Sequence, residues 1–149
     1  MTIATLADLI ATVETGGNPA PQFASKFEPD WSYTTPQSIE RCMAVHGCSE
    51  ATADTILRTS WGFYQIMGSV IYDLTAGTPP HIFRSYLSTP SLQLIYFNHF
   101  NSQYCGTCTL NDFLTNDPAA AHFCSRWNGN EAVYMGRCQD ILRSQGLIK

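Results

Sequence analysis

The chain has 149 residues, of which 44% are hydrophobic and only 13% are charged, and its formal net charge is −4. Globular domains usually carry about 25% charged residues, so the surface must be rich in uncharged polar side chains. The negative charge and the lack of a basic run exclude a nucleic-acid backbone as partner. The length predicts a single domain, residues 1–149, with one sizeable core.

The first predicted element is an amphipathic helix over residues 3–14. Apolar residues recur there at helical spacing, and the breaker cluster Thr15-Gly16-Gly17-Asn18-Pro19 ends the pattern. Glu14 therefore lies in the last helical turn, at the mouth of a loop. Residues 20–35 scatter aromatic side chains among polar ones, which predicts irregular structure or a small hairpin.

From Pro36 onward the pattern predicts helices. The expected segments are a helix that begins at Pro36, one capped by Ser49 that ends at Leu57, a buried central helix over 60–74, one opened by Thr89-Pro90, a short one over 110–114, one from Asp117-Pro118 to Trp127, and a last one over 131–143 stopped by Gly146. The predicted fold class is α+β, mainly helical, with one small non-helical corner after Glu14.

The N-terminus lacks a basic region and an unbroken apolar run, and no segment reaches the ~18 apolar residues of a membrane helix. We therefore expect no secretory signal and no membrane insertion. The protein would stay in the cytosol or leave it by another route, such as cell lysis or assembly into a virion.

Six cysteines allow three disulfides, but their spacing does not fix the pairing. Cys105-Gly-Thr-Cys108 is a CxxC motif without a second CxxC or a nearby histidine pair, so we expect no metal site. It also lacks the βαβ context of a thioredoxin-like motif. Buried apolar thiols and structural disulfides formed after release are the interpretations that remain.

Glu14 is the candidate for acid chemistry. Cleavage of a glycosidic bond needs a carboxylic acid in an apolar, partly closed pocket that protonates the leaving oxygen. The glycine turn after Glu14 leaves room for a substrate, and Phe23, Phe27 and Trp61 are candidates for the apolar wall. A lone glutamate at a helix end is, however, most often a solvated charge.

Three segments taken together carry a resemblance to a known family. Val13-Glu14-Thr15-Gly16-Gly17-Asn18-Pro19 resembles the catalytic-glutamate segment of lytic transglycosylases and goose-type lysozymes. The segment Ser60-Trp61-Gly62-Phe63-Tyr64-Gln65-Ile66-Met67-Gly68 resembles their Ser-x-Gly-x-x-Gln-Ile motif, and Arg126-Trp127-Asn128-Gly129 resembles their Tyr-Asn-x-Gly segment. With Phe27-Glu28-Pro29, the chain resembles more closely the N-acetylmuramidase domain of phage endolysins, over about residues 5–145. The resemblance implies a lysozyme-like fold.

The resemblance also implies roles for single residues. Glu14 would be the general acid, and Glu28 the second carboxylate. Ser60, Gly62 and Gln65 would line the substrate groove, Gln65 as a hydrogen-bonding partner of sugar or peptide. Asn128 would hold the far wall of the cleft, next to Trp127.

Each of these roles has a structural alternative. The aromatic residues of 60–67 fit a core, and Gln65 fits a partner for a buried backbone group. Glu28 fits a solvated loop charge, and Asp30 is a lesser rival for the role of second carboxylate. Asn128-Gly129 fits a turn between two helices.

Trp127 departs from the family, which has a tyrosine there. An indole N–H can only donate a hydrogen bond, so another hydroxyl, that of Tyr64 or of Tyr134, would have to serve in its place. Glu28 bears on the reaction, because hydrolysis usually uses a second carboxylate. A lytic transglycosylase closes a 1,6-anhydro ring with the 6-hydroxyl of the substrate, and one acid suffices.

The sequence thus predicts a peptidoglycan muramidase that needs no metal or organic cofactor. It would act on the glycan strands of the periplasm or cell wall, from the host cytoplasm or a virion, as a monomer or within a larger assembly with other virion proteins. The alternatives are a lytic transglycosylase, as in a secretion apparatus, and a non-catalytic virion or wall-binding protein on the same fold. A disulfide-stapled binding module is a weaker third.

Overall fold

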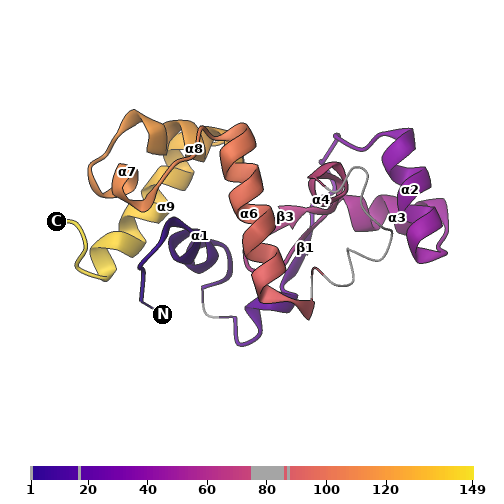
Figure 1. Ribbon diagram of the computed structural model, residues 1–149, viewed down its shortest axis with the longest axis horizontal. Coiled ribbons are helices and arrows are strands. Elements are labelled where there is room, and N and C mark those ends of the chain that lie inside the picture. The colour runs from indigo at the N-terminus through magenta and orange to yellow at the C-terminus, as the bar shows by residue number, and fades with distance from the viewer. Residues whose placement is uncertain (1, 17, 75–85, 87) are drawn as a thin grey trace. The chain divides into compact units, whose positions relative to one another are not determined.

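The computed structural model describes residues 2–16, 18–74, 86 and 88–149 (Figure 1). The chain is mainly helical and has a small three-stranded antiparallel sheet, which confirms the predicted α+β class. It divides into two compact units: a terminal unit, Met1–Gly16 with Phe97–Lys149, and a middle unit, Gly17–Tyr96. The single catalytic domain over 1–149 stays a prediction.

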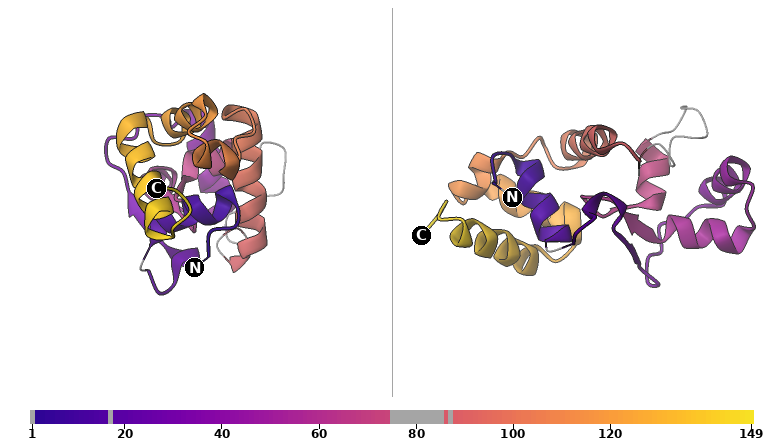
Figure 2. Two further views of the ribbon diagram at one scale, coloured as in Figure 1. Left: turned by 90° about the vertical axis from the view of Figure 1, so that its left-hand side faces the viewer. Right: turned by 90° about the horizontal axis from the view of Figure 1, so that it is seen from below.

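The terminal unit is built from helices. They are α1 (Leu6–Thr15), the second part of α6 (Pro90–Tyr104), α7 (Leu110–Leu114), α8 (Pro118–Asn128) and α9 (Glu131–Ser144). Helix α9 packs against both α8 and α1 (Figures 1 and 2). A core of fully buried side chains includes Phe97, Phe113, Phe123, Tyr134 and Leu142.

Local signals explain where these helices begin and end. Thr5 and Asp8 form a capping box at the start of α1, and the Asp117 side chain accepts a hydrogen bond from the first turn of α8. Gly129 ends α8 at a φ of 77°, a left-handed conformation that glycine adopts without strain. The predicted bounds of α1, α7, α8 and α9 are therefore close to those observed.

The middle unit combines helices with the sheet. It holds the 3₁₀ helix η1 (Pro21–Phe23), β1 (Ser25–Phe27), α2 (Pro36–His46), α3 (Glu50–Leu57), β2 (Thr59–Trp61), β3 (Ile66–Met67), α4 (Gly68–Leu74) and the first part of α6. The strand order is β1-β2-β3, with Lys26 opposite Ser60 and Ser60 opposite Met67. Pro36 and Ser49 open their helices as predicted.

The predicted helix over residues 60–74 is wrong in its first half. Residues 59–67 form a β2–β3 hairpin, and helix begins only at Gly68. Gly62 at φ 78° and Gln65 at φ 49° both adopt the left-handed region, which breaks a helix and closes the tight turn. The run is apolar because Tyr64 and Ile66 are buried in the hairpin.

The corner after α1 also differs in detail from the prediction. Residues 20–35 contain one strand, β1, and its partner is β2 rather than a second strand within that segment. The non-helical corner is therefore assembled from two distant stretches of sequence, of which only the first was predicted.

Candidate active site

Glu14 lies in the last turn of α1, as predicted, with its side chain half-buried. The buried face of this helix, which includes Leu9, Ile10 and Val13, packs into the terminal unit. Arg137 of α9 donates a hydrogen bond from Nη2 to the Val13 carbonyl oxygen at 2.7 Å. A cation at this point complements the partial negative charge of the helix C-terminus. The backbone that carries Glu14 is thus tied to α9.

The Glu14 carboxylate accepts two hydrogen bonds, both on Oε1. The Tyr134 hydroxyl of α9 donates at 2.6 Å, and the Trp127 indole N–H of α8 donates at 3.1 Å. The partners are 120 and 113 residues from Glu14 in sequence. Among the described residues, Oε2 has no such donor. One carboxylate oxygen therefore accepts both hydrogen bonds, and the other accepts none from the described residues.

An aromatic cluster fixes the Trp127 ring. Its centroid lies 5.3 Å from that of Phe123 in a stacked arrangement, and 5.4 Å and 5.0 Å from those of Phe97 and Phe100 in edge-on arrangements. Such ring pairs favour defined orientations. The cluster thus holds the Trp127 indole N–H as a hydrogen-bond donor to Glu14.

The sequence offered two tyrosines, Tyr64 and Tyr134, as the source of a hydroxyl near Glu14, and it is Tyr134 that donates to the carboxylate. Burial raises the pKa of Tyr134 well above its usual value, and the neighbouring Glu14 raises it further. The guanidinium of Arg137, 5.5 Å from the ring centroid, opposes this rise in pKa. Tyr134 therefore remains a protonated donor. Tyr64 belongs to the middle unit.

The middle unit brings Ser60 and Gln65 together, as their motif predicts. Ser60 Oγ lies 2.9 Å from Gln65 Oε1 and 3.2 Å from the carbonyl oxygen of Lys26. The Gln65 amide donates to the carbonyl oxygens of Gly62 at 2.9 Å and Ala24 at 3.2 Å. These contacts tie β1 to the β2–β3 turn, which is the structural alternative for Gln65. Its contact with a sugar stays a prediction.

Gly62 is required by a neighbour within the middle unit. A Cβ at Gly62 would lie 2.2 Å from Oε1 of Gln93, a fully buried side chain of α6. Gln93 Oε1 accepts from the Phe63 N–H at 2.8 Å, and its amide donates to the Gln22 carbonyl oxygen at 3.1 Å. Gln93 was not predicted; a single amide inside an apolar helical pattern was the available signal. The approach of a sugar to Gly62 stays a prediction.

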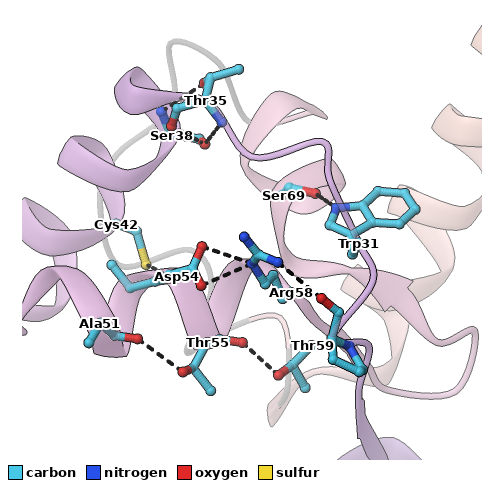
Figure 3. Close-up of polar contacts among 12 residues, drawn as sticks. Trp31, Thr35, Ser38, Cys42, Ala51, Asp54, Thr55, Arg58, Thr59 and Ser69 are labelled. Atoms are coloured by element: carbon cyan, nitrogen blue, oxygen red, sulfur yellow. Dashed lines mark hydrogen bonds and ion pairs between the residues drawn. The ribbon is translucent and has the colours of Figure 1, made fainter.

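The segment that carries Glu28 is anchored by Arg58 (Figure 3). The guanidinium pairs with Asp54 at 2.9 Å and donates to the Pro29 carbonyl oxygen at 3.1 Å, while the Glu28 N–H donates to the Arg58 carbonyl oxygen at 2.9 Å. Further along, the Trp31 indole N–H donates to Ser69 of α4 at 2.8 Å (Figure 3). The segment is thus fixed at both ends.

The Glu28 carboxylate itself pairs with Lys26 at 2.7 Å, and both side chains are substantially exposed. Asp30, its rival, is exposed.

The predicted residues thus fall into two groups. Glu14 and Trp127 meet in the terminal unit, where Asn128 is an exposed residue at the end of α8, in the predicted turn. The others belong to the middle unit; they are Glu28, Ser60, Gly62 and Gln65. Of the predicted apolar wall, Phe23 and Phe27 are 60% and 50% exposed. Arg137 was not predicted, because nothing local marks a residue that binds α1.

Neither family models, curated proteins nor solved structures match this chain. Within the described residues, no group of three or more His, Cys, Asp or Glu side chains is arranged to hold a metal ion. No described helix is long and apolar enough to cross a membrane.

Proposed function

We propose that this protein is a peptidoglycan muramidase with Glu14 as its general acid. It would cleave the β-1,4 bond between N-acetylmuramic acid and N-acetylglucosamine on a lysozyme-like fold, in phage lysis or entry. The observation that carries the proposal is the Glu14 carboxylate, with Tyr134 and Trp127 donating to one oxygen and no described donor on the other.

This arrangement suits proton donation to a glycosidic oxygen. A general acid must hold its proton within hydrogen-bond reach of the leaving oxygen, and Oε2 is the oxygen free to do so. When the proton leaves, negative charge develops on the carboxylate. Hydrogen bonds to a charged acceptor are about twice as strong as neutral ones, so Tyr134 and Trp127 would stabilise the charge as it forms.

The second step separates two reactions. In hydrolysis Glu28 would align the attacking water or act as nucleophile. The ion pair with Lys26, however, gives the Glu28 carboxylate a partner of its own. A Glu28 carboxylate that is paired with Lys26 favours a lytic transglycosylase, in which the substrate's own hydroxyl attacks and Glu14 alone suffices.

Mass spectrometry of the soluble products from purified peptidoglycan tests both proposals. A muramidase releases fragments with reducing muramic acid ends, whereas a transglycosylase releases fragments lighter by one water. In either case Glu14→Gln abolishes release. A Glu28→Gln variant that loses activity supports hydrolysis through Glu28.

If folded wild-type protein releases nothing from several wall types over a range of pH, the catalytic proposal is wrong. A wall-binding or virion role then takes its place.

A further inference from the structure

Two thiols meet where α8 packs against α9 in the terminal unit. Cys124 of α8 and Cys138 of α9 are both free thiols with 0% of their surface exposed, and each lies close enough to the other to shift its pKa. The two helices pack against each other (Figures 1 and 2). Two buried thiols on facing sides of packed helices can be bridged by a disulfide when their backbones approach closely enough.

This thiol pair is one helical turn from the two donors to Glu14. Cys124 precedes Trp127 by three residues on α8, and Cys138 follows Tyr134 by four residues on α9. Residues at these spacings lie on the same helix face. A covalent link between the two thiols would therefore join the helix segments that hold Glu14 Oε1.

The two thiols differ in acidity in a way that suits exchange chemistry. The adjacent Cys138 thiol lowers the pKa of Cys124, whereas Cys124 and burial raise the pKa of Cys138. The thiolate is the attacking species in disulfide exchange.

We propose that Cys124 and Cys138 form a disulfide when the chain folds in the presence of a small-molecule disulfide such as oxidised glutathione. The Cys124 thiolate attacks one sulfur of the oxidant, its S–S bond breaks, and one glutathione thiolate leaves. Cys138 then loses its proton and attacks Cys124 Sγ, which releases the second glutathione. Two electrons pass from the protein thiols to the oxidant, and no other reactant is needed.

Two other cysteines of the terminal unit compete for this pairing. Cys105 and Cys108 are buried, and Cys124 raises the pKa of each, but both lie in the segment between α6 and α7, whereas Cys138 lies on α9, which packs along α8. Cys108 instead contacts the Thr109 carbonyl oxygen and Asp112. The geometry therefore favours Cys138 as the partner of Cys124.

Disulfide mapping of the wild-type protein tests the proposal without any variant. The protein is refolded with a glutathione redox mixture, free thiols are alkylated, and the chain is cut without reductant after arginine and before aspartate. These cuts separate Cys124, on Asp117–Arg126, from Cys138, on a fragment that begins at Cys138, and from the fragment with Cys105 and Cys108. The expected product is a cross-linked pair of the first two fragments. Alkylated Cys124 and Cys138, or a link from either to Cys105 or Cys108, would overturn the proposal.

Thermal unfolding gives a second readout that does not depend on catalysis. A cross-link that closes a loop of this size is expected to raise the unfolding midpoint by roughly 5 °C or more relative to the reduced protein. Cys124→Ser should remove most of that difference. Cys48→Ser, a half-buried thiol of the middle unit, is the matched control and should retain it. An equal or greater loss in the control would contradict the proposal.

Discussion

The polar centres of the two units are organised in opposite ways. In the terminal unit, donors from α8 and α9 converge on one oxygen of Glu14 and leave the other without a described donor. In the middle unit, the Gln65 amide is bonded to Ser60 and to backbone carbonyls of its own corner. The first arrangement leaves one carboxylate oxygen without a described protein partner, whereas the second joins the strands and turns of its own unit. A cluster of polar contacts therefore does not by itself identify a site. The more informative feature is a side-chain atom whose hydrogen-bonding capacity the surrounding residues leave unused.

The largest loss of stability is expected from Gly62→Ala. The substitution strains a residue at φ 78° and places a Cβ against the buried Gln93 amide, so the free energy of unfolding should fall by roughly 2–4 kcal/mol. Gly47→Ala is the matched control, because Gly47 also has a positive φ but its Cβ would meet nothing within 4 Å. Denaturant titration of both variants separates the cost of backbone strain at positive φ from the cost of the contact with Gln93. Equal losses would show that the contact with Gln93 costs nothing.

Gln65→Ala should lower the free energy of unfolding by about 2–3 kcal/mol, because it leaves the Ala24 and Gly62 carbonyl oxygens without their donor. Gln103→Ala, an exposed position on α6, is the control and should change it by less than about 0.5 kcal/mol.

Activity of the Gln65→Ala variant then sharpens the comparison. It is measured well below the unfolding midpoint, where the variant remains folded. If Gln65 only stabilises the fold, turnover should be near that of the wild type under these conditions. A large drop in turnover would show that Gln65 also contacts the substrate.

Tyr134→Phe removes the shorter donor to Glu14 and should lower the free energy of unfolding by about 1.5–2 kcal/mol and muramidase activity about tenfold. Because the pKa of the buried hydroxyl is raised, the native state keeps this proton while the unfolded chain loses it above about pH 10. The stability advantage of wild type over the variant should thus be constant at neutral pH and shrink above pH 10. Urea titrations from pH 7 to 11 measure it; an advantage that grows with pH would contradict the assignment.

Lys26→Met should have the smallest effect, below about 0.5 kcal/mol in the free energy of unfolding, because its ion pair with Glu28 is exposed and screened. Its activity is the informative readout. Activity that changes several-fold, with stability unchanged, would indicate that the ion pair between Lys26 and Glu28 bears on the reaction.

Local signals made most of the fold predictable. The residues that begin helices, such as Pro36, Ser49 and Asp117, act within one turn of their own position, so the sequence around them is sufficient. The run from 60 to 74 was misread because an apolar stretch looks alike in a buried helix and in a buried hairpin. What decides between them is the turn at Gly62, which is completed by Gln93 about thirty residues away.

In the candidate site too, local sequence indicated the central residue but not its distant hydrogen-bond partners. Glu14 could be found from its helix end and its motif, but its two donors could not be assigned because they are more than 110 residues away. From the sequence, Trp127 was judged an incomplete replacement for a tyrosine hydroxyl. Only the structure shows that its indole N–H donates a hydrogen bond to Glu14. Arg137 acts on a backbone carbonyl, which leaves no trace in local sequence.

The rate of fragment release from purified peptidoglycan by Glu14→Gln tests the central claim most directly. The amide oxygen can still accept from Tyr134 and Trp127, so the variant should stay folded while the rate falls by at least about 100-fold. Glu131→Gln, an exposed residue in the first turn of α9, should keep the wild-type rate. A folded Glu14→Gln variant that releases fragments as fast as wild type would contradict the account.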